Sequence, residues 1–121
     1  MSFHVKTRTI DSVVVLDLSG RLTAGEPVTQ LHEALRSHLD KLDRKFILNL
    51  GEVSYIDSSG LGELVWAYTS VRNQDGAVKL LNLTAKVKDL LQITKLLTVF
   101  DTYDSESRAI SSLTGWPSKE P

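Results

Sequence analysis

The sequence Tyr55-Ile56-Asp57-Ser58-Ser59-Gly60-Leu61-Gly62 decides how the chain is organised. Apolar residues lead up to it, small and polar residues fill it, and a helical pattern follows it. This order predicts a strand, a tight turn and the start of a helix, where Asp57, Ser58 or Ser59 can accept a hydrogen bond from an unpaired N–H group. Two glycines in a first helical turn also indicate that something approaches the backbone closely there.

The residue types leave two interpretations of Asp57-Ser58-Ser59 open. In the simpler one, these side chains only cap the helix. In the other, a serine is an exposed phosphorylation site, and a phosphate there adds about −1.5 to −2 charges. The helix dipole and the free N–H groups favour an anion at this position, whereas the neighbouring Asp57 repels it.

The composition predicts a single soluble domain. A chain of 121 residues fits one domain, and a hydrophobic fraction of 41% is enough for a core. The net charge of −1 provides no electrostatic reason to bind nucleic acid or an anionic membrane. The absence of cysteine excludes disulfides, thiol catalysis and cysteine-ligated metals. The first residues lack a signal-peptide core, and no apolar run approaches the roughly 20 residues of a membrane span, so we expect a cytoplasmic protein.

The first half of the chain shows strand and helix patterns in turn. Alternation over residues 3–10 and a β-branched run over 13–18 predict a hairpin. The apolar run 46–50 predicts a central strand covered on both faces, which residues 51–56 link to the Asp57 turn. A first helix after Pro27 is predicted from apolar residues that recur at offsets of 3 and 4, namely Val28, Leu31, Leu35, Leu39 and Leu42.

The second half of the chain continues this succession of helix and strand patterns. A second helix over about 59–72 has an apolar face, and a strand over 77–83 precedes a third helix capped by Thr84. A short last strand holds Val99, Phe100 and Tyr103, and a final helix ends at Leu113. The predicted face of the second helix consists of Leu61, Leu64, Val65 and Tyr68, with Val71 at its edge. The order ββαβαβα with a last strand and helix predicts an α/β domain with right-handed crossovers.

Trp66 lies away from the apolar face of the second helix, below Ser59 and Gly62. One interpretation is a side chain half-covered by a neighbouring loop. The other is a contact residue on the same surface as the serines, because tryptophan is enriched in binding hot spots.

Catalytic patterns are few. The sequence contains no Gly-x-Ser-x-Gly elbow, phosphate-binding loop or dinucleotide fingerprint. A nucleophilic Ser58 would need a base, and the three histidines, His4, His32 and His38, all lie at positions typical of solvated or rim side chains. We therefore expect a protein that is not an enzyme and that carries no metal or cofactor.

The segment 57–62 resembles the phosphorylation motif of the anti-sigma factor antagonists of the STAS domain family. Gly20-Arg21-Leu22-Thr23 resembles an early turn of that family, and the segments 46–50 and 77–91 resemble its central strand and a later strand–helix unit. The resemblance covers about residues 3–113. It implies a single small α/β domain over residues 1–113, with a mixed sheet of four to five strands and about four helices packed mainly on one side. Residues 114–121 are expected to form a flexible tail.

The resemblance also implies a function. The unphosphorylated antagonist binds an anti-sigma factor, a serine kinase of the GHKL-type ATPase class, and thereby releases a sigma factor. The kinase phosphorylates the antagonist, which blocks binding, and a PP2C-like phosphatase reverses the modification. The acceptor position carries over to Ser58, with Ser59 as the second choice. The expected partner surface of this monomer or weak dimer comprises Asp57, Ser58, Ser59, Gly60, Leu61, Gly62, Trp66 and Thr23.

A second class of function is a scaffold. STAS domains also occur in stressosomes and as small subunits of lipid-transport complexes, where phosphorylation can be absent. The intact Asp57-Ser58 pair favours the switch. The segment Thr23-Ala24-Gly25-Glu26-Pro27 departs from the Leu-Asp pattern of many relatives and leaves open which anti-sigma factor is recognised.

Overall fold

The computed structural model describes residues 3–114, so the predicted tail lies, from residue 115 onward, outside the described residues. Five strands form one sheet in the order β1-β2-β3-β4-β5, in which β1 and β2 pair antiparallel and the later neighbours pair parallel. The predicted order of elements is confirmed: β1 (His4–Ile10), β2 (Val13–Leu22), α1 (Glu26–Asp40), β3 (Lys45–Ile56), α2 (Ser58–Asn73), β4 (Ala77–Leu81), α3 (Ala85–Ile93), β5 (Asp101–Tyr103) and α4 (Glu106–Leu113).

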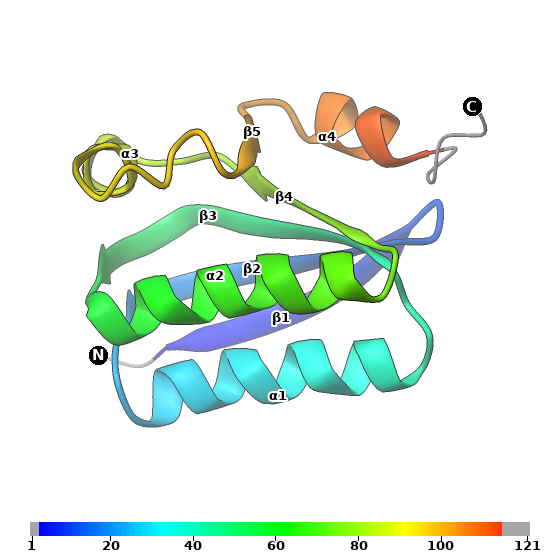
Figure 1. Ribbon diagram of the computed structural model, residues 1–121, viewed down its shortest axis with the longest axis horizontal. Coiled ribbons are helices and arrows are strands. Elements are labelled where there is room, and N and C mark those ends of the chain that lie inside the picture. Colours follow the sequence, from blue (N-terminus) through cyan, green and yellow to red (C-terminus); the bar gives the residue numbers. More distant parts are fainter. Residues whose placement is uncertain (1–2, 115–121) are drawn as a thin grey trace.

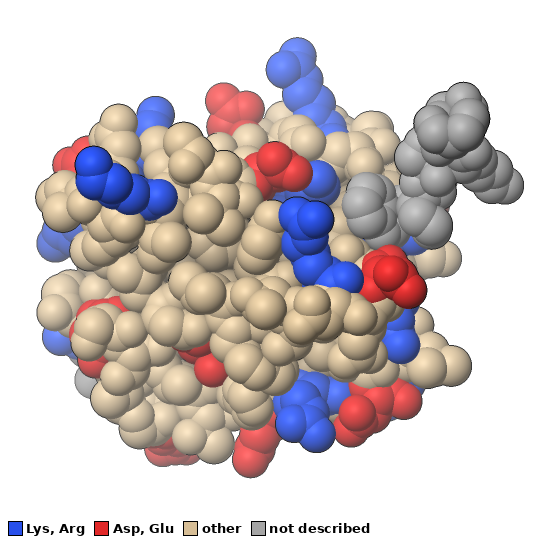
Figure 2. Space-filling view, in the orientation of Figure 1, with Lys and Arg blue, Asp and Glu red and all other residues tan. Residues whose placement is uncertain are grey.

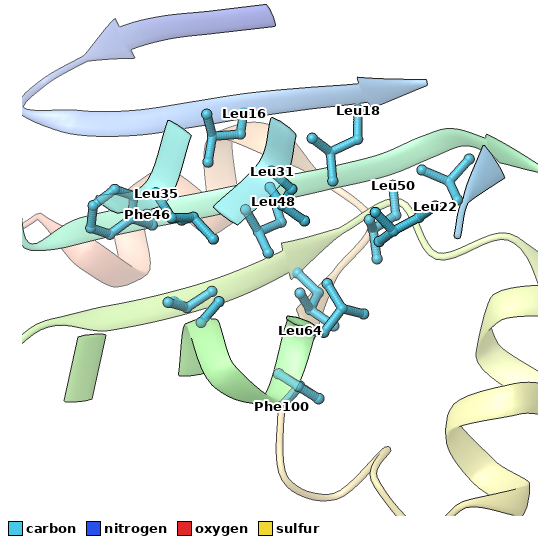
Figure 3. Close-up of a cluster of buried hydrophobic side chains, with 14 of the residues drawn as sticks. Leu16, Leu18, Leu22, Leu31, Leu35, Phe46, Leu48, Leu50, Leu64 and Phe100 are labelled. Atoms are coloured by element: carbon cyan, nitrogen blue, oxygen red, sulfur yellow. The ribbon is translucent and has the colours of Figure 1, made fainter. Parts of the chain in front are cut away.

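The helices cover the sheet unequally. Figure 1 shows α1 and α2 side by side along one face of the sheet, with α4 on the other. The main core joins α1, α2 and α3 to the sheet through leucines such as Leu16, Leu31, Leu48 and Leu64 (Figure 3). A smaller cluster joins α4 to the opposite face through Ala109, Ile110 and Leu113. Three of the four helices therefore share one core, as the family resemblance implies.

Residues 51–56 belong to β3, so the prediction that they form a link was wrong. The strand continues because β2 runs alongside it, with Val53 opposite Gly20 and Ile56 opposite Leu22. Two register shifts accommodate this longer pairing, and each leaves one extra residue in β3, between Asn49 and Glu52 and between Val53 and Tyr55. As a result, β2 and β3 end at the same place, and the turns that follow them lie next to each other.

Two further predictions need correction. Leu42 lies beyond the end of α1, where a φ of 72° breaks the helical path, and its side chain is 75% exposed rather than part of the apolar stripe. The last strand is limited to Asp101–Tyr103, and Val99 lies exposed before it. In both cases the apolar residue fits the sequence pattern of the helix or strand, but its backbone lies outside that element.

Leu35 and Leu42 provide a matched test of this packing. Leu35 is fully buried, so Leu35→Ala is expected to lower the free energy of unfolding by about 2–5 kcal/mol. Leu42→Ala removes the same atoms from an exposed side chain and is expected to change it by less than about 0.5 kcal/mol. Chemical denaturation followed by circular dichroism measures both, and equal losses would place Leu42 in the core.

Candidate functional site

Asp57 ties together the turns that follow β2 and β3. Its Oδ1 accepts the N–H of Gly60 at 2.8 Å, which caps α2, and its Oδ2 accepts the N–H of Ala24 at 2.9 Å. Its own N–H donates to the Leu22 carbonyl oxygen at 3.3 Å. The amide groups of Ala24 and Gly60 lower the pKa of the Asp57 carboxyl below its usual range, so this side chain carries a charge at neutral pH.

Ser58 and Ser59 are the first two residues of α2, and both are exposed. Within residues 3–114, neither hydroxyl is hydrogen-bonded to another side chain or to the backbone, so the fold does not use them. The N-cap is Asp57 alone. Both hydroxyls are therefore free for modification at a helix end that stabilises anions.

The two glycines of the turn have different environments. A Cβ atom on Gly60 would overlap the Leu22 carbonyl oxygen and lie 2.9 Å from Cγ2 of Ile56. The close approach indicated by the sequence is therefore made by the chain's own β2 at Gly60. A Cβ atom on Gly62 would meet nothing within 4 Å, because this residue faces solvent.

Thr23 and Leu61 are half-buried residues that stabilise the two turns through backbone hydrogen bonds. The Thr23 carbonyl oxygen accepts the N–H of Val28 at 3.2 Å, so half-buried Thr23 orders the start of α1 beside Ala24. The N–H of Leu61 donates to the Asp57 carbonyl oxygen at 2.9 Å, and its side chain packs against the main core. The structure thus brings together all the predicted residues of the turn, with Thr23, at one edge of the sheet.

Glu63 is a buried carboxylate that the sequence analysis missed. Its side chain is 7% exposed, and its two oxygens lie 3.0 and 3.2 Å from Nδ1 of His32 on α1. The imidazole ring of His32 stacks on Trp66, with ring centroids 4.0 Å apart. Trp66 is therefore half-covered by a helix, so that of its two interpretations the one with a covering loop was wrong about the covering element.

The buried face of α2 is also rotated from the predicted one. Because α1 packs alongside, the buried positions are Gly60, Glu63, Leu64, Ala67 and Val71. Leu61, Val65 and Tyr68 are only partly buried against the same core. The spacing of Gly60, Glu63 and Ala67 by three and four residues was the available signal, but the charge of Glu63 argued against burial.

A shallow apolar groove of about 280 Å³ lies beside the Asp57 turn, between the end of β3 and α3. Ile93 projects at its border with 78% of its surface exposed. The guanidinium carbon of Arg21 lies 4.4 Å from the ring centroid of Tyr55. The groove is lined by Tyr55, Ile56, Lys86, Val87, Asp89, Leu90 and Ile93.

The exposed side of α2 carries almost no charge. The sequence of this helix contains only two charged residues, Glu63, which is buried, and Arg72 in the last turn. Figure 2 accordingly shows a mainly uncharged surface over α2. An uncharged surface beside an apolar groove is typical of a protein–protein contact.

Two further features of the described residues bear on the kind of site. Within residues 3–114, no group of three or more histidine, aspartate or glutamate side chains is placed to hold a metal ion. Among the helices of that same part of the chain, none has the length and apolarity needed to cross a membrane.

The family model described as the STAS domain matches residues 4–109. The chain belongs to the STAS domain family. An anti-sigma-B factor antagonist of Listeria monocytogenes is 29% identical over 106 residues, which are 88% of this chain and 91% of the relative. The STAS assignment therefore rests on a match over nearly the whole described chain.

Solved structures agree with this assignment. A candidate anti-sigma factor antagonist from Thermotoga maritima superposes with a TM-score of 0.85, 27% identity, and coverage of 91% of this chain and 94% of the other. Unphosphorylated SpoIIAA, an anti-sigma factor antagonist, superposes with a TM-score of 0.72 at 22% identity, over 94% and 99% of the two chains. The SpoIIAA match shows the shared fold of this STAS domain.

Asp57→Ala is expected to cost more stability than the loss of an ordinary helix cap. Removing a cap costs about 1 kcal/mol, and Asp57→Ala also releases the Ala24 turn. The control is Thr84→Ala, which removes the cap of α3, where Oγ1 accepts the N–H of Val87 at 3.2 Å. Urea denaturation at pH 7 measures the free energy of unfolding of both variants. Equal losses would contradict the conclusion that Asp57 stabilises the Ala24 turn as well as the start of α2.

The Asp57 contribution is also expected to depend on pH. Because its pKa is lowered in the folded protein, the stabilisation is present above the unfolded value of about 3.9 and is lost as the pH falls below it. The unfolding free energies of the wild type and of Asp57→Ala should therefore converge in acid. Denaturation curves between pH 3 and pH 7 test this, and a constant difference would contradict it.

Gly60→Ala and Gly62→Ala are expected to have opposite effects. Gly60→Ala forces β2 and α2 apart and lowers the free energy of unfolding. Gly62→Ala replaces an exposed helical glycine without a clash and is expected to raise it by up to about 1 kcal/mol. Thermal and denaturant unfolding compare the two, and a stable Gly60→Ala variant would contradict the close approach.

Proposed function

We propose that this STAS domain is a phosphorylation-gated anti-sigma factor antagonist of the bacterial cytoplasm. Its unphosphorylated form binds a serine-kinase-type anti-sigma factor of the GHKL ATPase class, and a sigma factor is released. Phosphorylation on Ser58 blocks binding, and a PP2C-like phosphatase restores it. The observation that supports this proposal is the exposed, unused Ser58 hydroxyl directly after the Asp57 cap, in a family that includes named anti-sigma factor antagonists.

The surface around Ser58 suits a contact formed with a neutral hydroxyl. Ser58, Ser59 and Gly62 are exposed and uncharged, and the apolar groove at Tyr55 and Leu90 extends the surface toward α3. A partner that buries this surface must remove water from every polar group in it. A phosphate dianion on Ser58 then carries a large desolvation cost, to which the nearby Asp57 carboxylate adds repulsion.

Control of binding by phosphorylation requires that the unphosphorylated and phosphorylated forms differ greatly in affinity for the anti-sigma factor. Moving a population from mostly bound to mostly free takes about 5.5 kcal/mol of differential binding. One buried dianion can supply several kcal/mol of this, because charged groups lose far more hydration than a hydroxyl does. Since the Ser58 hydroxyl takes part in no hydrogen bond within residues 3–114, phosphorylation changes the surface and leaves the fold intact.

The deciding experiment is phosphosite mapping by mass spectrometry on the protein isolated from its own cells, with bound partners identified in the same sample. The expected result is phosphate on Ser58 and a GHKL-type ATPase bound only to the unphosphorylated form. Phosphate on Ser59 would move the acceptor by one residue. An unmodified protein held in a larger assembly would overturn the gate and support the scaffold function.

Substitutions of Ser58 are expected to separate binding from modification. Ser58→Asp places a charge in the contact and should weaken binding of the ATPase by at least about tenfold, or roughly 1.4 kcal/mol. Ser58→Ala should bind normally and resist phosphorylation, whereas Ser59→Ala should still be phosphorylated. Calorimetry and kinase assays measure these changes.

A charge-matched control is available on the other face of the sheet. Ser111 is exposed on α4, so Ser111→Asp adds the same charge away from the proposed surface and should leave affinity unchanged. Undiminished binding by Ser58→Asp would count against the gate. Equal weakening by both variants would point to a general charge effect instead of a local contact.

A further inference from the structure

The N–H groups at the start of α2 are largely occupied by Asp57. Its Oδ1 accepts the N–H of Gly60 at 2.8 Å, and the N–H of Ser59 also helps to lower the pKa of this carboxyl. The N–H of Leu61 donates to the Asp57 carbonyl oxygen at 2.9 Å. Within residues 3–114, the N–H of Ser58 is the one donor of this first turn that has no acceptor. A phosphate on Ser58 therefore meets a helix end whose donors already hold another anion.

The Asp57 carboxylate is also fixed in place from the opposite side. Its Oδ2 accepts the N–H of Ala24 at 2.9 Å, and its own N–H donates to the Leu22 carbonyl oxygen at 3.3 Å. Hydrogen bonds to a charged carboxylate are among the stronger ones in proteins. The side chain therefore cannot turn away from a phosphate on Ser58 without losing its bonds to two turns.

Basic side chains do not take the place of these amide groups. Residues 46–71 include no lysine or arginine. Because Ile56 is buried in the main core, Tyr55 beside it in β3 points to the opposite face of the sheet, and Arg21 stacks on Tyr55 there. Lys86 of α3 is exposed across the groove from Tyr55. A phosphate at the start of α2 thus has no cation on its own segment to neutralise it.

We propose that Asp57 is a positioning residue of the phosphorylation gate, which keeps the phosphate of Ser58 away from the N–H groups of α2 and exposed to solvent. This inference rests on the proposed function, because it concerns the phosphorylated form. A fully hydrated dianion carries its whole desolvation cost into any contact that buries it. It also stays accessible to a phosphatase. Asp57 thus makes the modification both effective against binding and readily reversible.

The first test measures the interaction of the phosphate with Asp57 in the free protein. Phosphoserine is incorporated at Ser58 during synthesis, so that no kinase is needed, in the wild type and in Asp57→Asn. Asparagine still caps a helix but carries no charge. In urea denaturation, the phosphate should not raise the equilibrium constant for folding of the wild type. In Asp57→Asn it should raise this constant about two- to fivefold, the range of an anion at a helix start.

The design of this comparison removes the structural effect of the substitution. Loss of the Ala24 hydrogen bond affects the phosphorylated and unphosphorylated forms of Asp57→Asn alike, so it cancels. Glu33→Gln removes the same charge from an exposed position of α1 and should leave the effect of the phosphate as in the wild type. A phosphate that stabilises the wild type as much as Asp57→Asn would overturn the inference. Circular dichroism checks that each variant is folded.

The second test measures how accessible the phosphate is. Nonspecific alkaline phosphatase should release it from Asp57→Asn about two- to fivefold more slowly than from the wild type, since the helix start holds it part of the time. Mass spectrometry follows the reaction. Phosphopeptides of residues 52–64, with and without the substitution, give the intrinsic rates by which the protein rates are divided. Equal ratios for the two proteins would show that Asp57 does not control access to the phosphate.

These outcomes separate the inference from the proposed function. If Ser58→Asp weakens partner binding but the phosphate stabilises the wild type, the phosphorylation gate stands and the positioning role of Asp57 fails. If the protein from its own cells carries no phosphate on Ser58, the gate fails and the regulatory role of Asp57 fails with it. The stability comparison needs neither partner nor kinase, so it decides on the exclusion of the phosphate in either case.

Discussion

The carboxylate of Asp57 accepts hydrogen bonds from two amide groups that are far apart in the sequence, and the geometry of the site depends on this arrangement. One amide, that of Gly60, begins α2, and the other, that of Ala24, belongs to the turn before α1. A single charged side chain therefore joins the start of α2 to the turn before α1. The lack of a side chain at Gly60 is part of the same constraint, because it lets the first turn of α2 lie against the Leu22 carbonyl oxygen.

The sheet supplies the frame for this arrangement. β2 and β3 run parallel and end together, and the first helix after each of them packs on the same face, so both turns lie at one edge. The core beneath is dense in fully buried leucines, which makes the edge rigid. The Ser58 hydroxyl lies outside this framework. A modification there can therefore change what a partner meets without disturbing the packing that positions it.

Asp57 and Glu63 both carry a carboxyl group, but their surroundings shift its pKa in opposite directions. Asp57 lies at the helix start, where amide donors stabilise its charge and lower its pKa. Glu63, six residues later, is buried between α1 and α2, where loss of water raises its pKa and His32 provides the compensating charge. The first carboxylate holds the turn at neutral pH, and the second joins α2 to His32 of α1.

The sequence by itself determined the order of the elements, the α/β class and the strand–turn–helix unit at Asp57. These features follow from local periods, caps and glycines, which need no knowledge of distant contacts. Only the tertiary structure decided that β3 extends to Ile56, that Leu42 is exposed, that Glu63 is buried against His32, and that an apolar groove lies beside Tyr55. Each of these depends on a neighbour brought close by the fold. A charged residue such as Glu63 is read as exposed until the partner that compensates its burial is known.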